Sequence, residues 1–288
     1  MPLLALVLVT AVWGVTFVQV KDAVAIYPLF AFLAVRFAIA SLTLAAPAAG
    51  RVRRLGPSGW LAGCAVGALL AAGYVLQTAG LARTTVSGAG FVTGMYVILT
   101  PLIALILFRA KIGRAAWVAT AVAVVGLAMI SGVHAGSSTG DLLVLGGAAV
   151  FALQIVLIDR YAPRFDPLAL TFVEMLAACV VLTAVALPRG DLALPHGRTV
   201  WAALLVTGIF ASALGYLFQT WAQRRIDATR TALLFSLEPV WAGVFGFALA
   251  GDRLGLLGWS GCAVILIGIA LAEPTAAAVL ARLVGAGR

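Results

Sequence analysis

Residues 59–81 read GWLAGCAVGALLAAGYVLQTAGL, a run of 23 residues without a charged side chain. About 20 apolar residues are enough for a helix to cross the hydrocarbon core of a bilayer. The rest of the chain is similar, because 64% of its 288 residues are hydrophobic and 10% are charged, against about 45–50% and about 25% in soluble domains. This composition excludes a water-soluble enzyme and predicts that the lipid bilayer surrounds most of the chain.

Nine further apolar ranges accompany this one, each bounded by charged residues, proline or glycine. The ten ranges are 3–20, 29–46, 59–81, 88–108, 115–132, 141–158, 167–187, 199–222, 229–250 and 255–272. We therefore expect an all-α membrane protein with ten transmembrane helices. The first range has no basic segment before it and no clear cleavage site after it, which favours a retained helix over a signal peptide.

The basic residues predict the orientation. The even-numbered connections (51–54, 109–114, 160–164 and 224–230) and the tail hold thirteen Lys and Arg residues, and the odd-numbered connections hold five. Under the positive-inside rule, both termini are then cytoplasmic. The net charge of +9 has this origin, so no nucleic-acid partner is expected. Cys64, Cys179 and Cys262 each lie within an apolar range, which argues against disulfides or a metal site.

The chain repeats itself. A shift of 142 positions aligns 71–130 with 213–272, and Gly73-Tyr74-x-x-Gln77-Thr78 recurs as Gly215-Tyr216-x-x-Gln219-Thr220. At shifts of 138 or 139, Trp13 aligns with Phe151, Thr16 with Gln154 and Pro28 with Pro167.

Each repeat would hold five helices, and an odd number makes the second repeat enter the membrane from the opposite side. We therefore expect two inverted five-helix repeats, at 1–132 and 141–273, followed by a cytoplasmic tail at 274–288. Inverted repeats are common in secondary transporters, in which two halves move about a site near the membrane midplane.

Two motifs resemble the EamA family of the drug/metabolite transporter superfamily. They are Trp13-Gly14-x-x-Phe17-x-x-x-Lys21 in the first range and Leu237-Glu238-Pro239, followed by Gly251-Asp252-Arg253-Leu254, around the ninth. The resemblance covers nearly the whole chain. It implies ten helices in two repeats, a bacterial inner-membrane location and movement of small solutes, often outward. Tyr96-Val97 stands in the first repeat where the second has Glu238-Pro239, so the acidic site is not duplicated.

Three charged residues are expected at membrane depth. Counting about 1.5 Å per residue from the ends of the ranges, Arg36, Glu174 and Glu238 each lie about 10–13 Å deep. Charges at this depth face a protein interior or a wet cavity. Arg36 is a candidate for holding a substrate carboxylate or for ordering an acid. Glu174 and Glu238 are candidates for taking up and releasing a proton. The alternative is a permanent structural ion pair, or a carboxylate that is hydrogen-bonded to neighbouring helices.

Aromatic and polar residues predict a substrate site. Trp13 and Phe151 lie near the midplane, with Thr16 and Gln154 about one turn further on, and Tyr96 and Trp241 fall at similar depth. An apolar cavity with a few hydrogen-bonding groups suits small amphipathic solutes. The alternative is that buried aromatic residues only fill volume between helices.

The duplicated Tyr-x-x-Gln motif is a candidate pair of gates. Tyr74 and Gln77 are expected toward the outer face, and Tyr216 and Gln219 toward the inner face. A Tyr and a Gln one turn apart share a helix face and can close a pathway by hydrogen bonds. Interhelical hydrogen bonding without gating is the alternative.

The motifs give little support to an enzyme. Gly258-x-Ser260-Gly261 matches a pattern of intramembrane serine proteases, but His134 and His196, the two histidines of the chain, lie in connections. The chain contains no His-Glu-x-x-His motif and no phosphate-binding loop, so no metal or cofactor is expected.

The sequence thus predicts a monomeric secondary transporter that works by alternating access and moves amino acids or similar amphipathic solutes, with efflux favoured and proton coupling left open. The alternatives are a multidrug or organic-cation exporter, an uncoupled facilitator, and a membrane scaffold or channel that transports nothing.

Overall fold

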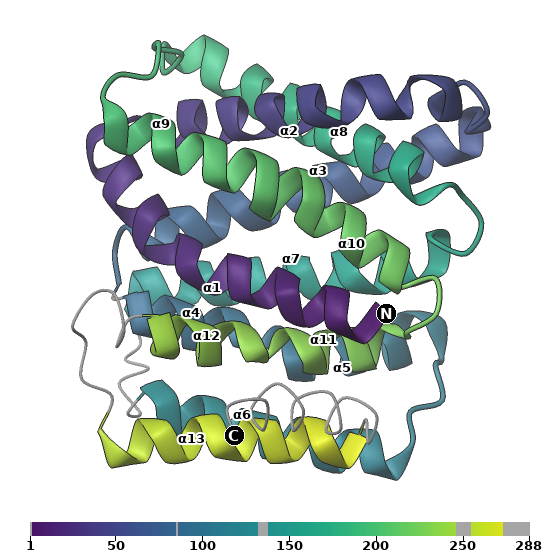
Figure 1. Ribbon diagram of the computed structural model, residues 1–288, viewed down its shortest axis with the longest axis vertical. Helices are drawn as coiled ribbons and strands as arrows, with labels where there is room; N and C mark the ends of the chain where they lie inside the picture. Colours follow the sequence, from purple (N-terminus) through teal and green to yellow (C-terminus); the bar gives the residue numbers. More distant parts are fainter. Residues whose placement is uncertain (1, 85, 132–137, 246–254, 273–288) are drawn as a thin grey trace, which may run out of the picture.

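The computed structural model describes residues 2–84, 86–131, 138–245 and 255–272, and helices with short connections make up nearly all of them (Figure 1). No β-strand occurs in these ranges. Up to residue 131 the helices are α1 (Pro2–Ile26), α2 (Leu29–Val52), α3 (Gly56–Leu81), α4 (Val86–Gly94), α5 (Tyr96–Phe108) and α6 (Arg114–Ser131). From residue 138 they are α7 (Thr139–Tyr161), α8 (Pro167–Ala186), the 3₁₀-helix η1 (Leu187–Arg189), α9 (Arg198–Leu205), the π-helix η2 (Val206–Leu214), α10 (Gly215–Ala222), α11 (Ala228–Phe235), α12 (Leu237–Phe245) and α13 (Leu256–Ala272).

Seven helical segments of the described chain are long and apolar enough to span a membrane. They are Pro2–Ile26, Leu29–Val52, Gly56–Leu81, Gly88–Phe108, Thr139–Tyr161, Pro167–Arg189 and Arg198–Ala222. Two shorter apolar helices, Arg114–Ile130 and Leu256–Ala272, fall in two more of the expected ranges. The prediction of an all-α integral membrane protein is confirmed. Ten crossings stay a prediction, because length and composition identify seven.

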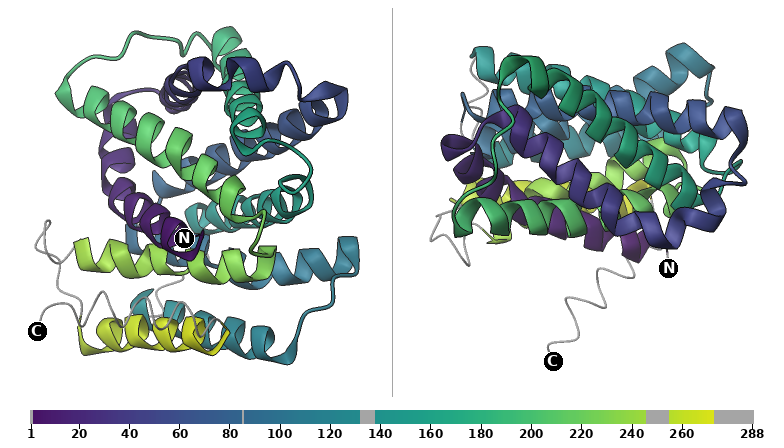
Figure 2. Two further views of the ribbon diagram at one scale, coloured as in Figure 1. Left: turned by 45° about the vertical axis from the view of Figure 1, so that its right-hand side comes forward. Right: turned by 90° about the horizontal axis from the view of Figure 1, so that it is seen from above.

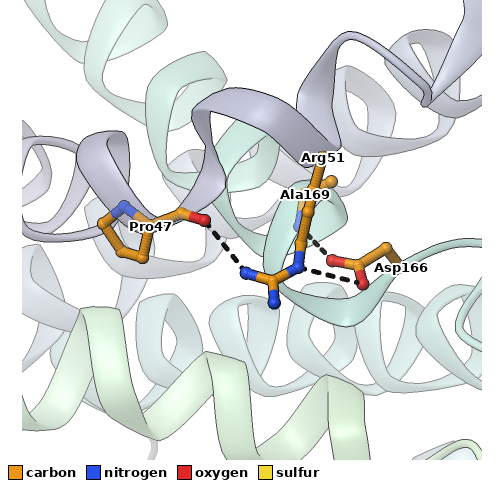
Figure 3. A network of polar contacts seen from close by, with 4 residues as sticks. All are labelled: Pro47, Arg51, Asp166 and Ala169. Carbon is orange, nitrogen blue, oxygen red and sulfur yellow. Dashed lines mark hydrogen bonds and ion pairs between the residues drawn. The ribbon is translucent and has the colours of Figure 1, made fainter.

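Polar residues begin several of the helices. Ser138, Asp166 and Asp227 each cap the helix that follows by accepting a hydrogen bond from a backbone N–H in its first turn, which satisfies one of the unpaired donors at a helix N-terminus. Asp166 also meets Arg51 at the end of α2, with 3.6 Å between Arg51 Nε and Asp166 Oδ2 (Figure 3). This contact joins the end of α2 to the beginning of α8.

The helix axes lie roughly along one line, with neighbours in either chain direction, and the helices are stacked along the long axis of the molecule (Figures 1 and 2). The helices α2 and α8 pack together at one end of this axis, α6 and α13 pack together at the other, and α1 and α7 lie between them. In Figure 1 the N-terminus and the connections α2–α3, α5–α6 and α10–α11 lie at the right-hand ends of the helices, whereas α1–α2 and α8–α9 lie at the left-hand ends. The connections rich in arginine therefore lie on one side of the molecule.

Two helices are interrupted at corresponding places. The helical hydrogen bonding breaks at Met95, between α4 and α5, and at Ser236, between α11 and α12. Pro239 has no N–H group, so the carbonyl of Phe235, four residues earlier, lacks its helical partner. The hydroxyl of Tyr96 donates a hydrogen bond to that carbonyl at 2.9 Å. Tyr96 thus compensates for the proline break.

Glycine allows α6 and α13 to approach each other closely. A Cβ atom at Gly126 would lie 2.7 Å from the carbonyl oxygen of Gly261, and one at Gly268 would lie 3.0 Å from that of Ala119. Small residues let helix backbones meet in this way inside membranes. This helix pair is thus held by backbone packing.

Three expectations fall on residues outside the described ranges: the tail at 274–288, the Gly251-Asp252-Arg253-Leu254 motif and His134.

Candidate functional site

A cavity lies among α1, α2, α3, α7, α10 and the interrupted helices. Its volume is about 50 Å³, which is room for roughly three to five waters. Aromatic, amide and hydroxyl side chains line it, together with one cation and one acid. The lining residues are Trp13, Thr16, Phe17, Val20, Arg36, Tyr74, Gln77, Thr78, Leu81, Thr93, Tyr96, Phe151, Gln154, Ile155, Tyr216, Gln219, Phe235 and Glu238.

Arg36 supplies the cation from the middle of α2, and its side chain is buried. Its Nε donates to Ser212 Oγ at 2.8 Å and its Nη2 donates to Tyr74 Oη at 2.9 Å. The guanidinium carbon lies 4.2 Å from the centre of the Tyr74 ring, which is a cation–π contact. No carboxylate of the described residues lies within ion-pairing distance. The guanidinium therefore faces the cavity with hydroxyl partners and without a counter-ion from the described part of the chain.

Four aromatic side chains form a row from Arg36 towards Glu238. The ring centres are 6.4 Å apart for Tyr74 and Tyr216, 5.4 Å for Tyr216 and Trp13, and 4.8 Å for Trp13 and Phe235. The indole N–H of Trp13 donates to the carbonyl of Ala211 at 2.8 Å, which fixes the ring against η2. The row gives the cavity an apolar wall with the Arg36 guanidinium at one end and the Glu238 carboxyl group at the other.

Glu238 supplies the acid at the beginning of α12. The Tyr96 hydroxyl lies 3.2 Å from Glu238 Oε2 and 2.9 Å from the Phe235 carbonyl oxygen. One hydroxyl proton serves two acceptors here, and the shorter contact goes to the carbonyl. Glu238 therefore stays available to another donor that enters the cavity.

Buried amides join the cavity to Glu174 on α8. Gln154 Nε2 donates to Glu174 Oε1 at 2.8 Å, and Gln219 Nε2 lies within hydrogen-bond distance of Gln154 Oε1 at 3.1 Å and of Gln223 Oε1 at 3.0 Å. Gln223 in turn donates to the Ile155 carbonyl at 2.9 Å. Glu174 Oε2 and Gln219 Oε1 are buried and have no hydrogen-bond partner among the described residues, so this network holds two unsatisfied oxygen atoms.

The cavity brings together most of the residues expected to bind substrate. Trp13, Thr16, Arg36, Tyr96, Phe151 and Gln154 all line it. Trp241 does not line it; its ring stacks on Phe245 with 5.9 Å between centres. Glu174 is also absent from the lining and is fully buried behind Gln154.

The expected separation of the two Tyr-x-x-Gln motifs to opposite faces is wrong for the tyrosines. Tyr216 Oη donates to Tyr74 Oη at 3.0 Å, so the two hydroxyls meet in the cavity. Corresponding residues can touch when both lie near the axis that relates two halves, and the linear count of depth misses this. Gln77 and Gln219 have different partners, because Gln77 Nε2 donates to Thr93 Oγ1 at 3.1 Å.

Sequence reasoning missed three residues that shape the site. Ser212 holds Arg36, Gln223 extends the amide network, and Phe235 ends the aromatic row and supplies a carbonyl to Tyr96. The spacing of Gln223 one turn after Gln219 was a usable signal. Ser212 and Phe235 carried none, because a serine or phenylalanine in an apolar helix is ordinary.

A family model for the EamA-like transporter family matches residues 1–132 and 138–273. The chain belongs to the EamA-like transporter family. This confirms the resemblance drawn from the sequence motifs and identifies the chain as an integral membrane protein of a transporter family.

Named relatives agree with this EamA assignment. An "uncharacterized transporter" of Archaeoglobus fulgidus is 31% identical over 92% of this chain and 83% of its own length. The "uncharacterized inner membrane transporter YedA" of Escherichia coli K12 is 27% identical over 90% of this chain and 86% of its own. The "threonine/homoserine exporter RhtA" of the same organism is 30% identical, over 40% of this chain and 39% of its own.

One solved crystal structure has the same fold. It superposes with a TM-score of 0.78 at 18% sequence identity and covers 96% of both chains. At this identity the likeness concerns the fold alone.

Proposed function

We propose that this protein is a secondary transporter for small amphipathic metabolites that carry a carboxylate, with amino acids as the favoured class. The observation that carries the proposal is Arg36, a buried guanidinium that opens on an aromatic cavity and lacks a counter-ion among the described residues. A buried cation of this kind is costly unless an anion joins it. In a transporter, a substrate that enters the cavity can supply this anion.

The cavity offers matching groups to the rest of such a solute. The Tyr74 hydroxyl accepts from Arg36 and from Tyr216, so its own proton is free to donate to a carboxylate. Trp13 and Phe151 provide apolar walls, and Glu238 and Gln219 Oε1 are acceptors for an ammonium or hydroxyl group. RhtA is named a threonine/homoserine exporter, which supports the same class of substrate and favours efflux.

Alternating access between two inverted five-helix halves is the proposed mechanism. Its support is the reciprocity of contacts: Tyr74 touches Tyr216 and Tyr96 touches Glu238, each pair 142 positions apart. The contacts of Gly126 and Gly268 across α6 and α13 are also reciprocal. Surfaces related by a two-fold axis meet their own counterparts in this way. Because the cavity is narrow, the Tyr74–Tyr216 contact must part before a solute enters, which makes the pair a central gate.

The remaining expectations belong to the same proposal. The proposal also includes ten membrane crossings, cytoplasmic termini, a bacterial inner-membrane location and a monomeric state. A monomer is consistent with one chain that carries both halves. YedA, which is named an inner membrane transporter, supports the location. Proton coupling would use Glu174 or Glu238.

Counterflow in liposomes that contain the purified protein tests the proposal. The liposomes are loaded in turn with threonine, homoserine, an aromatic amino acid, the amide of that amino acid and a lipophilic cation, and uptake of each labelled compound is followed. Saturable exchange of the carboxylates, with weaker exchange of the amide, is the expected result. Exchange of the cation alone would favour the organic-cation exporter, for which the aromatic row and Glu238 would serve. No exchange of any compound would overturn the proposal.

A further inference from the structure

Arg36 and Glu174 occupy equivalent places in the two halves. A Cβ atom on Gly67 of α3 would collide with the carbonyl oxygen of Glu174 and lie 2.8 Å from Ala177 Cβ. A Cβ atom on Gly208 of η2 would lie 3.1 Å from the carbonyl oxygen of Arg36 and 2.9 Å from Ile39 Cβ. Each glycine thus faces one residue's carbonyl and the side chain three positions later. Arg36 and Glu174 are 138 positions apart, and so are Ile39 and Ala177.

A second pair of contacts has the same spacing. Gly73 faces the Phe151 ring, with 2.6 Å from its added Cβ to Cε1, and Gly215 faces Trp13, with 3.0 Å to Nε1. Trp13 and Phe151 are also 138 positions apart. Because two independent glycine contacts agree, the register that equates Arg36 with Glu174 does not depend on one coincidence.

The two equivalent places differ in their exposure to the cavity. Arg36 lines the cavity, whereas Glu174 is fully buried and lies outside the lining. Glu174 Oε1 accepts from Gln154, and Oε2 has no partner. The charged or titratable side chains on the elements packed against α8 are Arg36 and Arg51 on α2, Cys64 and Tyr74 on α3, Arg189 on η1 and Tyr216 on α10. None of the six forms a hydrogen bond or ion pair with the Glu174 carboxyl group.

We infer that Arg36 and Glu174 take turns at the cavity, so that the site presents a cation when it opens to one side of the membrane and a carboxyl group when it opens to the other. This inference rests on the proposed exchange between inverted halves. In such an exchange each half takes up the arrangement that the other half has in the opposite state. Glu174 then moves to the cavity-facing place, and Arg36 moves to the sealed one.

The exchange assigns a proton step to Glu174. In the sealed place the carboxyl keeps its proton on Oε2, because a buried carboxylate with no cation beside it is costly. In the cavity-facing place its O–H bond can break, with the electron pair staying on the oxygen and the proton passing to water. Return to the sealed place needs that proton back from the same side. Glu174 therefore makes the return step depend on the pH of one side only.

Side-specific labelling tests the inference. Arg36→Cys and Glu174→Cys are made in a chain whose Cys64, Cys179 and Cys262 are replaced, with that cysteine-free chain as the control. Liposomes with a single protein orientation are exposed to a membrane-impermeant maleimide, added outside or enclosed inside. The expected result is labelling of the two cysteines from opposite sides, with at least a tenfold difference in rate between sides. Labelling of both from the same side, or of the Glu174→Cys chain from neither, would overturn the inference.

A second measurement tests the inference if the cysteine variants fail to fold. Exchange by the wild type is followed while the pH is raised on one side at a time. We expect the rate to fall on one side only, by up to about tenfold per pH unit for a single proton, and Glu174→Gln to respond on neither side. An equal response on both sides, or an unchanged response in Glu174→Gln, would contradict the inference. If exchange itself is absent from the wild type, the proposed function fails instead, so the two failures are distinguishable.

Discussion

Glycine residues allow close backbone contact both in the α6–α13 pair and among the helices around the cavity, but the contact has a different role in each region. In the pair, Gly126 and Gly268 lie against the carbonyls of Gly261 and Ala119. Around the cavity, Gly67 and Gly208 lie against the carbonyls of Glu174 and Arg36, whose side chains end in a carboxyl group and a guanidinium. Where the neighbouring side chains are apolar, close backbone contact only holds the helices together. Where the neighbouring side chains are polar, it also positions the residues of the site. Four sets of substitutions test this comparison.

The largest effect is expected from Arg36→Gln. Loss of charge-assisted bonds of about 1.5–3 kcal/mol each should lower kcat/KM for a carboxylate substrate about 10- to 100-fold. Arg114→Gln, at the exposed beginning of α6, is the matched control and should leave exchange unchanged. Both are measured by counterflow per folded molecule. Equal losses of kcat/KM in Arg36→Gln and Arg114→Gln would contradict a different role in transport for the cavity and the α6–α13 pair.

Gly67→Ala and Gly126→Ala should both destabilise the protein, by about 1–3 kcal/mol, because the added methyl group meets a backbone carbonyl. Only Gly67→Ala should also reduce exchange per folded molecule, since it displaces Glu174. Thermal unfolding in detergent measures the first effect and counterflow the second. Gly50→Ala on α2, which has open space around it, is the control and should not destabilise. A loss of exchange in Gly126→Ala would show that the peripheral pair also shapes the site.

Tyr96→Phe should cost about 1 kcal/mol, because the Phe235 carbonyl loses the donor that compensates for Pro239. Tyr27→Phe is its counterpart in the connection between α1 and α2, where the hydroxyl donates to the Ala193 carbonyl at 2.6 Å. It should cost a similar amount or less without altering transport. A change of exchange in Tyr96→Phe alone would show that the hydroxyl at the cavity contributes to transport and that the hydroxyl in the connection does not.

The smallest effect is expected at the contact drawn in Figure 3. Arg51→Ala removes an ion pair between side chains that are 54% and 42% exposed, which is worth at most about 0.5 kcal/mol. Asp166→Ala also removes the N-cap of α8 and should cost about 1 kcal/mol. Thermal unfolding of both variants distinguishes the cap from the ion pair, and equal destabilisation would contradict this division.

Composition and motifs are enough to identify the chain as a membrane protein and to assign its family. Apolar runs such as 59–81 predict helices in lipid, because no other open structure satisfies the backbone there. The motif around Trp13 and Gly14 and the one around Glu238 and Pro239 identified the family. Six of the seven residues expected to bind substrate line the cavity, because polar and aromatic side chains at membrane depth seek the protein interior.

Which of these residues meet is known only from the packing of the helices. Depth along a helix is readable from residue numbers, but the rotation of a helix about its own axis and its position relative to the other helices are not. Three features depend on those two quantities: the contact of Tyr74 with Tyr216, the burial of Glu174 behind Gln154, and the absence, among the described residues, of an acid within ion-pairing distance of Arg36. They are set by how the helices pack against one another, and a single apolar helix carries little information about its packing face, since lipid and protein interior are equally apolar.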